Sequence, residues 1–225
     1  MTDIQKIISL YNSRKTIIKL LSSLDYDVSD YKDFSINEID AMSNNSQLDM
    51  LLNKKTPKKN PKNERENETV DIYEKVYVKY YNTDKQKQLT KVILDSTIED
   101  LFRIEKILTN DDTLIIIMDD EPNDSNISRM NYLYDHDGKF VVMHNIKRLQ
   151  YDLTEHSLVP KMTILTIDET ASFMKEKNLT TLSQIPEISR YDPHALALCV
   201  RPKQVCKIER SSATALKCIY YRVCV

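Results

Sequence analysis

The sequence predicts an α+β protein with two domains, an N-terminal α/β domain around a mixed sheet and a small C-terminal α+β domain. In the N-terminal part, segments whose apolar residues recur at helical spacing alternate with short apolar runs that are typical of strands. Near the C-terminus, β-formers gather in two short segments that can pair as a hairpin. With 225 residues, of which 41% are hydrophobic, the chain can supply the core of one large domain or two small ones.

The first segment is predicted to be a long helix with one buried face, because apolar residues recur every three or four positions. These residues are Ile4, Ile7, Ile8, Tyr11, Ile18 and Leu21. Thr2 and Gln5 have the spacing of a capping box at the start of this helix. Ser35 and Glu38 have the same spacing, which predicts a second, short helix after Ser35.

Strand and helix signals then alternate. Residues 72–80 carry Ile72, Val76, Val78 and Tyr80 in the alternation of a half-buried strand. Residues 96–99 form another capping box, which predicts the start of a helix that runs to residue 108. Residues 114–118 are a continuous apolar run, which predicts a central strand covered on both faces.

Gly138 is the single glycine of the chain. It ends a polar tetrapeptide between apolar segments at 132–134 and 140–142, and a glycine adopts positive φ easily, so we expect a β-hairpin there. Phosphate-binding loops need several glycines, so nucleotide binding by such a loop is excluded.

The net charge and the cysteines limit the classes of protein to which this chain can belong. The net charge of −2 is too close to neutral for a protein that grips nucleic acid alone through a basic surface. The sequence has no apolar run long enough for a membrane span and no secretion signal at its start. The cysteines, Cys199, Cys206, Cys218 and Cys224, show no CxxC pair, which favours buried thiols over zinc ligands or disulfides.

Two polar segments leave alternatives open. Residues 53–69 contain no large apolar side chain, so we expect a mobile, solvated insertion; the alternative is a basic loop that touches DNA or serves as a localisation signal. Residues 119–124 contain four carboxylates after the central strand, and clustered carboxylates can bind Mg²⁺. A free-standing nuclease-like enzyme is therefore the alternative function, although no activating lysine or other catalytic constellation accompanies this loop.

The C-terminal third carries a series of short motifs. A His-x-Leu-Val-Pro element at 156–160 is followed by an amphipathic segment, an Ile-Pro-x-Ile turn at 185–188 and the pair Asp192 and Pro193. The chain then ends with Val-x-Lys-Ile-x-Arg at 205–210 and Tyr-Arg at 221–222. In this order and spacing, the segment resembles the assembly domain of the fifth common subunit of eukaryotic RNA polymerases and, over the same length, the small archaeal polymerase subunit of that family.

The N-terminal part is similar, more weakly, to the jaw domain of the same eukaryotic subunit, through residues 14–17 and 24–28. The resemblance and the loss of helical periodicity before Thr154 predict a jaw domain at 1–148 and an assembly domain at 149–225. Archaeal members lack the jaw, so a eukaryote or a large DNA virus is the expected source. The expected location is the nucleus, or the virion or cytoplasmic replication site for a virus.

Several residues depart from the family pattern. Cys199, Lys203 and Leu216 occupy positions where the family usually has glycine, so the backbone there must avoid positive φ or accept strain. Ala213 replaces an acidic residue. The segment 97–100 replaces a Thr-Pro element at a helix start, and its two carboxylates would repel DNA phosphates there.

The resemblance implies a non-catalytic polymerase subunit. The assembly domain would dock on the largest subunit, and the jaw would line the entry path of downstream duplex DNA, with one copy per hetero-oligomer and no membrane. We expect no catalytic residue, cofactor or metal site. The predicted partner interface consists of Asp192, Pro193, Lys207, Arg210, Thr214, Tyr221 and Arg222. The residues alone allow plainer roles: Asp192 suits a helix cap, and the arginines suit surface charges. A transient adaptor that borrows the assembly domain is a further alternative.

Overall fold

The computed structural model describes residues 3–57, 73–81, 89–212 and 215–225. The chain divides into two compact units, Met1–Tyr151 and Asp152–Val225, and we describe each by itself. Within the described residues, no helix combines the length and apolar content that crossing a bilayer requires.

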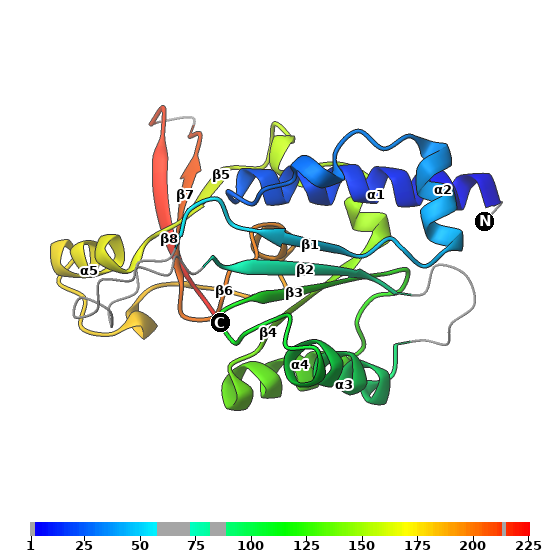
Figure 1. Cartoon of the computed structure of the whole chain (residues 1–225). Coiled ribbons are helices and arrows are strands. Elements are labelled where there is room, and N and C mark those ends of the chain that lie inside the picture. The colour runs from blue at the N-terminus through cyan, green and yellow to red at the C-terminus, as the bar shows by residue number, and fades with distance from the viewer. Residues whose placement is uncertain (1–2, 58–72, 82–88, 213–214) are drawn as a thin grey trace, which may run out of the picture. The chain divides into compact units, whose positions relative to one another are not determined.

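A four-stranded mixed sheet forms the centre of the N-terminal unit (Figure 1). Its order is β1 (Met50–Asn53), β2 (Lys75–Tyr80), β3 (Thr113–Met118) and β4 (Phe140–Asn145). β1 is antiparallel to β2, and the two other pairs are parallel. All residues of β3 are buried, which confirms the predicted central strand, and β2 buries Val76 and Val78 in the predicted alternation. Ile72 lies outside the described residues.

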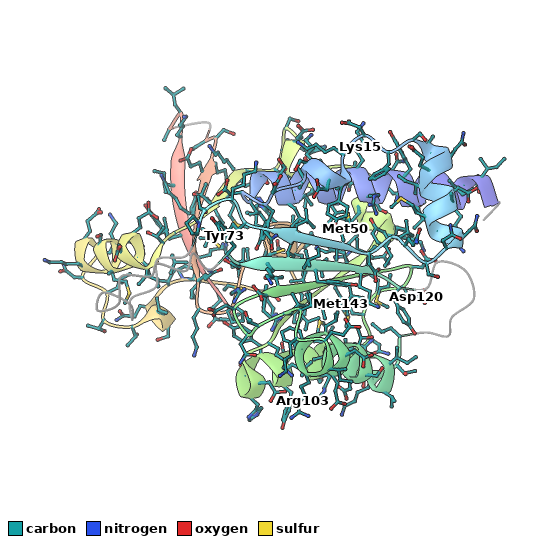
Figure 2. All side chains as sticks on the ribbon, viewed as in Figure 1. Lys15, Met50, Tyr73, Arg103, Asp120 and Met143 are labelled. Atoms are coloured by element: carbon teal, nitrogen blue, oxygen red, sulfur yellow. The ribbon has the colours of Figure 1, made fainter. Side chains whose placement is uncertain are left out.

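Helices cover both faces of this sheet (Figure 1). α1 (Asp3–Ser23) lies over one face, and α3 (Lys91–Glu99) and α4 (Asp124–Asp137) lie over the other, while α2 (Ile36–Asn44) packs against α1. Side chains fill the layers between them, and the buried Met50 and Met143 mark the two sides of the core (Figure 2). Short 3-10 turns lie at Ser29–Tyr31 and Ile146–Leu149, and a π-turn lies at Asp100–Ile104.

The long first helix is confirmed, but its buried face differs from the predicted one. Ile4 and Ile8 are exposed, whereas the buried stripe contains Leu10, Ser13, Arg14, Ile17, Leu20 and Leu21. Arg14 is buried, and its Nη1 donates to the Leu48 carbonyl over 2.7 Å while the guanidinium lies over the rings of Tyr31 and Phe34. Its Nε and Nη2 have no hydrogen-bond partner in the described part of the chain. Burial lowers the pKa of Arg14. The spacing of apolar residues alone does not predict a buried helical face that includes an arginine.

Capping predictions had mixed outcomes. The Ser35 box is confirmed, since Ser35 Oγ accepts from the Glu38 N–H and Glu38 accepts from the Ser35 N–H. Thr2 lies outside the described residues. The box at 96–99 is wrong: α3 already begins at Lys91, and Ser96 lies inside it, donating to the Ile93 carbonyl over 2.9 Å. Glu99 is the last residue of α3 and Asp100 is the first of the π-turn that follows it directly, so these carboxylates do not lie at a helix start and the expected phosphate repulsion there does not apply.

The predicted hairpin around Gly138 is also wrong. Residues 124–137 form α4, whose N-cap Asn123 accepts from the Asn126 N–H over 2.8 Å. Gly138 has the expected positive φ of 68°, but it ends the helix instead of turning a hairpin. β4 then pairs in parallel with β3, and a parallel pair needs a crossover such as α4. The aromatic residues of α4 are of a type that is common in strands, which explains the wrong prediction. The buried residues Asn126, Met130 and Leu133 instead recur at helical spacing.

The predicted insertion at 53–69 starts inside the fold. Asn53 ends β1, the Lys54 N–H donates to the Glu74 carbonyl, and Thr56 Oγ1 donates to an Asp25 carboxylate oxygen over 2.9 Å. These first residues are therefore held by hydrogen bonds. The predictions for residues 58–69 fall outside the described residues.

The C-terminal unit is a second mixed four-stranded sheet. Its order is β5 (Lys161–Ile164), β7 (Val205–Arg210), β8 (Cys218–Cys224) and β6 (Glu187–Ile188). β5, β7 and β8 are antiparallel neighbours, and β6 is parallel to β8. The helices are α5 (Ile167–Glu176) and α6 (Pro193–Ala197), with 3-10 turns at Leu153–Glu155 and Leu182–Gln184.

Each face of this sheet has its own small core. On one face, Cys206 and Cys224 pack with Met162, Val200 and Ala195 of α6. On the other face, Val205 and Val223 pack with Ile185, and the half-buried Phe173 of α5 and Tyr221 adjoin them. The base of the β7–β8 hairpin is therefore covered on both faces, while its far end extends beyond these cores.

Of the three positions where the family usually has glycine, two have the positive φ that strains a residue with a Cβ. Cys199 has φ of 50° and follows α6, where the Cys199 and Val200 N–H groups donate to the carbonyls of Leu196 and Ala195 in a Schellman arrangement. Lys203 has φ of 72° in the turn closed by the bond from the Gln204 N–H to the Arg201 carbonyl. Leu216 has no positive φ.

We expect Lys203→Gly to raise the free energy of unfolding of the C-terminal unit by roughly 0.5 to 1 kcal/mol. Left-handed backbone costs a residue with a Cβ about 1 to 2 kcal/mol, and the greater freedom of glycine in the unfolded chain offsets part of the gain. Thermal unfolding measures the change. Lys175→Gly, in the last turn of α5, is the matched control and should lose up to about 1 kcal/mol. A decrease for Lys203→Gly would contradict the strain at this turn.

Candidate docking surface

The β7–β8 hairpin carries four of the predicted interface residues. Its register pairs Cys206 with Arg222, Lys207 with Tyr221, and Arg210 with Cys218, without a bulge. Because side chains alternate between the faces of a strand, Arg210 and Arg222 lie on one face, and Lys207 and Tyr221 lie on the other.

On the Lys207 face, the predicted residues already have partners within the chain. Lys207 Nζ lies 3.2 Å from a Glu209 carboxylate oxygen, and this hydrogen bond lowers the pKa of Glu209. The ring of Tyr221 stacks on Phe173 of α5, with the centroids 4.0 Å apart. Tyr221 thus fixes α5 on the sheet, and Glu209 is not available to neutralise the arginines.

On the other face, Arg210 and Arg222 flank an apolar patch. Arg210 is exposed at the end of β7, and Arg222 is exposed on β8 with Nη1 donating to the Glu187 carbonyl over 2.8 Å. Between them along the same face lie Ile208 and Tyr220, and Tyr220 is 47% exposed. An exposed guanidinium beside an exposed aromatic ring is the composition found at protein interfaces.

Sequence reasoning missed Tyr220 as an interface candidate. The signal for it was present, because Tyr220 lies two residues before Arg222 on a strand and therefore on the same face. Ile219, which is 49% exposed on the opposite face, is a second residue that the predicted interface did not include.

Asp192 and Pro193 have a structural role in α6. The Asp192 carboxylate accepts from the His194 N–H over 2.9 Å, and Pro193 occupies the first helical position. This arrangement agrees with the plainer interpretation of Asp192 as a helix cap. Neither residue lies on the hairpin, and Thr214 lies outside the described residues.

The acidic loop does not assemble a metal site in the part of the chain that the structure describes, since no three His, Cys, Asp or Glu side chains gather there. Glu121 pairs with Arg148 over 3.0 Å, and Asp124 lies in the first turn of α4. Burial raises the pKa of Asp119. These contacts explain the polar loop as a helix start with an ion pair, so the geometry gives the nuclease alternative no ligand set.

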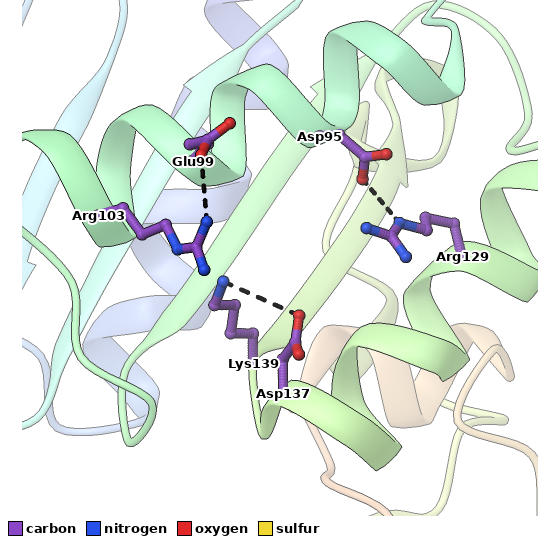
Figure 3. Close-up of polar contacts among 6 residues, drawn as sticks. All are labelled: Asp95, Glu99, Arg103, Arg129, Asp137 and Lys139. Carbon is purple, nitrogen blue, oxygen red and sulfur yellow. Dashed lines mark hydrogen bonds and ion pairs between the residues drawn. The ribbon is translucent and has the colours of Figure 1, made fainter.

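A charged hollow of about 350 Å³ lies in the N-terminal unit and is lined by residues of α3 and α4. Three ion pairs line it (Figure 3): Arg103 with Glu99 at 3.2 Å, Arg129 with Asp95 at 2.7 Å, and Lys139 with Asp137 at 4.0 Å. The charges of these six side chains balance, so the hollow does not favour a polyanion such as DNA.

Of the four cysteines, Cys206 and Cys224 are buried as predicted, whereas Cys199 and Cys218 are only half-buried. Cys206 and Cys224 lie in the core on neighbouring strands, and burial raises their pKa values to about 12 and about 11. Because the thiolate is the reactive and metal-binding form, these thiols are poor nucleophiles and poor ligands.

Comparison with known proteins identifies the same C-terminal segment. The family model described as "RNA polymerase Rpb5, C-terminal domain" matches residues 151–224. DNA-directed RNA polymerase subunit Rpo5 of Thermococcus celer is 37% identical over 76 residues, which are 34% of this chain and 92% of the archaeal protein. Subunit RPABC1 of DNA-directed RNA polymerases I, II and III of Caenorhabditis briggsae is 38% identical over 88 residues, which are 39% of this chain and 41% of the nematode protein.

The matched segment coincides with the C-terminal unit and contains both cores and the β7–β8 hairpin. The archaeal relative is covered almost over its whole length, whereas the nematode relative is covered over less than half. The chain therefore belongs to the Rpb5/RPABC1/Rpo5 family of DNA-directed RNA polymerase subunits.

Proposed function

We propose that this chain is the non-catalytic subunit of a multisubunit DNA-directed RNA polymerase that docks on the largest subunit through its C-terminal unit. One observation carries the proposal: the segment that matches the family is also the unit whose hairpin exposes Arg210, Arg222, Ile219 and Tyr220. A monomer normally avoids such an exposed apolar strand end, so the hairpin suits a protein partner.

The predicted interface residues have different roles in this proposal. Arg210 and Arg222 contact the partner directly through charge-assisted hydrogen bonds. Lys207 pairs with Glu209, and Tyr221 holds α5 against the sheet. Asp192 caps the start of α6, and Pro193 is its first residue. Thr214 is also proposed to contact the partner subunit.

The N-terminal unit is proposed to line the path of downstream duplex DNA without gripping it. This role comes from the resemblance of residues 14–17 and 24–28, and the balanced charge of the α3–α4 hollow gives no reason to expect that this hollow grips DNA. Phosphodiester chemistry then belongs to other subunits. A eukaryotic source places the chain in the nucleus, and a viral source stays a prediction.

The test compares the full chain with residues 149–225 for binding to the largest polymerase subunit. Both are expected to bind with similar affinity, and the full chain should be recovered from the assembled polymerase at one copy per enzyme. Binding by the full chain alone would show that docking needs the N-terminal unit. Substoichiometric recovery would favour the transient adaptor, and activity on DNA by the purified chain alone would favour the nuclease alternative.

A further inference from the structure

The outer edge of β8 offers an unfilled row of backbone hydrogen-bonding groups. β8 runs from Cys218 to Cys224, but β6 pairs only with Val223 and Cys224. Beside residues 218–222, no strand in the described part of the chain occupies the edge that faces away from β7. These unpaired backbone groups lie on the same edge of β8 that β6 pairs with at Val223 and Cys224.

The hydrogen bonds at the end of β8 determine which of its groups point outward. The Val223 and Val225 N–H groups donate toward β6, to the carbonyls of Pro186 and Ile188 over 2.9 and 3.0 Å. The Cys224 N–H donates to the Gln204 carbonyl, on the β7 side, over 2.9 Å. Because successive peptide groups of a strand point to opposite sides, the N–H and C=O groups of Ile219 and Tyr221 point to the vacant edge.

Side chains around this edge indicate the kind of segment that fits it. Ile219 and Tyr220 are half-exposed on opposite faces of β8, so both faces offer apolar contacts near the edge. Arg210, Lys217 and Arg222 carry positive charge around the hairpin, and the one carboxylate on its strands, Glu209, is paired with Lys207. The other free edge of the sheet, β5, is four residues long, with the exposed polar side chains of Lys161 and Thr163.

We infer that β8 accepts an extended, acidic segment of another polymerase subunit as an added strand of the sheet. The inference rests on the proposed docking function and specifies its mode. The outward groups of Ile219 and Tyr221 supply the main-chain hydrogen bonds, Ile219 and Tyr220 supply the apolar contacts, and the cations select carboxylates on the incoming segment. The positive charges also keep the free edge from pairing with a second copy of this chain.

Amide hydrogen exchange tests the inference on the full chain, alone and in the reconstituted polymerase, at single-residue resolution. In the free chain, the Ile219 and Tyr221 amides are expected to exchange quickly, while the Tyr220 and Arg222 amides, which face β7, are protected. In the polymerase, the first two should slow by at least tenfold. Incorporation into the polymerase without slowing at Ile219 and Tyr221, or with slowing at β5 instead, overturns strand addition while the docking function stands.

A pair of variants separates the backbone bond from the side chain. Ile219→Pro removes the outward N–H, and Ile219→Thr removes apolar surface but keeps that N–H. Ile219→Pro is expected to enter the polymerase at least tenfold less well than Ile219→Thr, and equal incorporation overturns the inference. If Ile219→Pro melts far below wild type, the exchange measurement on the wild-type chain decides the question. Failure of the wild-type chain to enter the polymerase would instead contradict the proposed function.

Discussion

The double variant Arg210→Glu/Arg222→Glu is expected to lose its place in the polymerase while it stays folded. Reversal replaces attraction with like-charge repulsion and leaves partner groups unpaired, which costs on the order of 2 to 5 kcal/mol of binding free energy at a buried contact. Binding should therefore weaken by a few orders of magnitude. Recovery of the variant with the polymerase, compared with that of wild type, measures the loss.

Both arginines are exposed in the free chain, so the melting temperature of the double variant should stay close to that of wild type. The intramolecular bond from Arg222 to the Glu187 carbonyl lies at the surface, and such a bond contributes little. Lys175→Glu/Lys177→Glu, on and next to α5, makes the same change in net charge outside the strands of the hairpin and should enter the polymerase normally. Unfolding of the arginine variant on its own would instead make these side chains intramolecular struts.

The elements that sequence reasoning predicted correctly are those with a local cause. Residues 114–118 become a buried central strand because no polar side chain interrupts the run, and Ser35 with Glu38 forms its box because both partners lie within one turn. The errors come from non-local causes. Tyr132 and Tyr134 look like strand residues, yet they belong to α4, which connects the parallel strands β3 and β4.

The candidate site divides in the same way. The β-formers of the two C-terminal segments, together with the family resemblance, predicted the hairpin strands and placed the arginines on them. The vacant edge of β8 depends on where β6 ends, and β6 has only two residues, so no periodic pattern reveals it. Sequence reasoning left two options for Lys203, to avoid positive φ or to accept it, and the fold takes the second because the turn after Arg201 requires it.

His144 on β4 provides a test of the core of the N-terminal unit. The side chain is buried, and its Nε2 has no hydrogen-bond partner among the described residues. Burial, with a smaller contribution from the positive charge of Arg148, lowers the pKa of His144 to about 4. The folded unit therefore holds this imidazole neutral, whereas the unfolded chain binds a proton near pH 6.5.

The sign of the pH effect follows from this difference. Above pH 6.5, both states are neutral at His144 and the residue has no effect on pH dependence. Between pH 6.5 and about 4, the unfolded state binds more protons, so the free energy of unfolding falls by roughly 3 kcal/mol as the pH decreases, and below about 4 the loss is complete.

His144→Phe cannot bind that proton, so its stability should fall less steeply over the same window, whatever its stability at neutral pH. Urea unfolding at several pH values measures the slope, and amide exchange in β4 assigns the transition to the N-terminal unit. His136→Phe makes the same substitution at an exposed position of α4 and is the matched control. If the two variants have equal slopes, water or a proton reaches His144 in the folded state, and the layer between β4 and its covering residues is more open than its burial indicates.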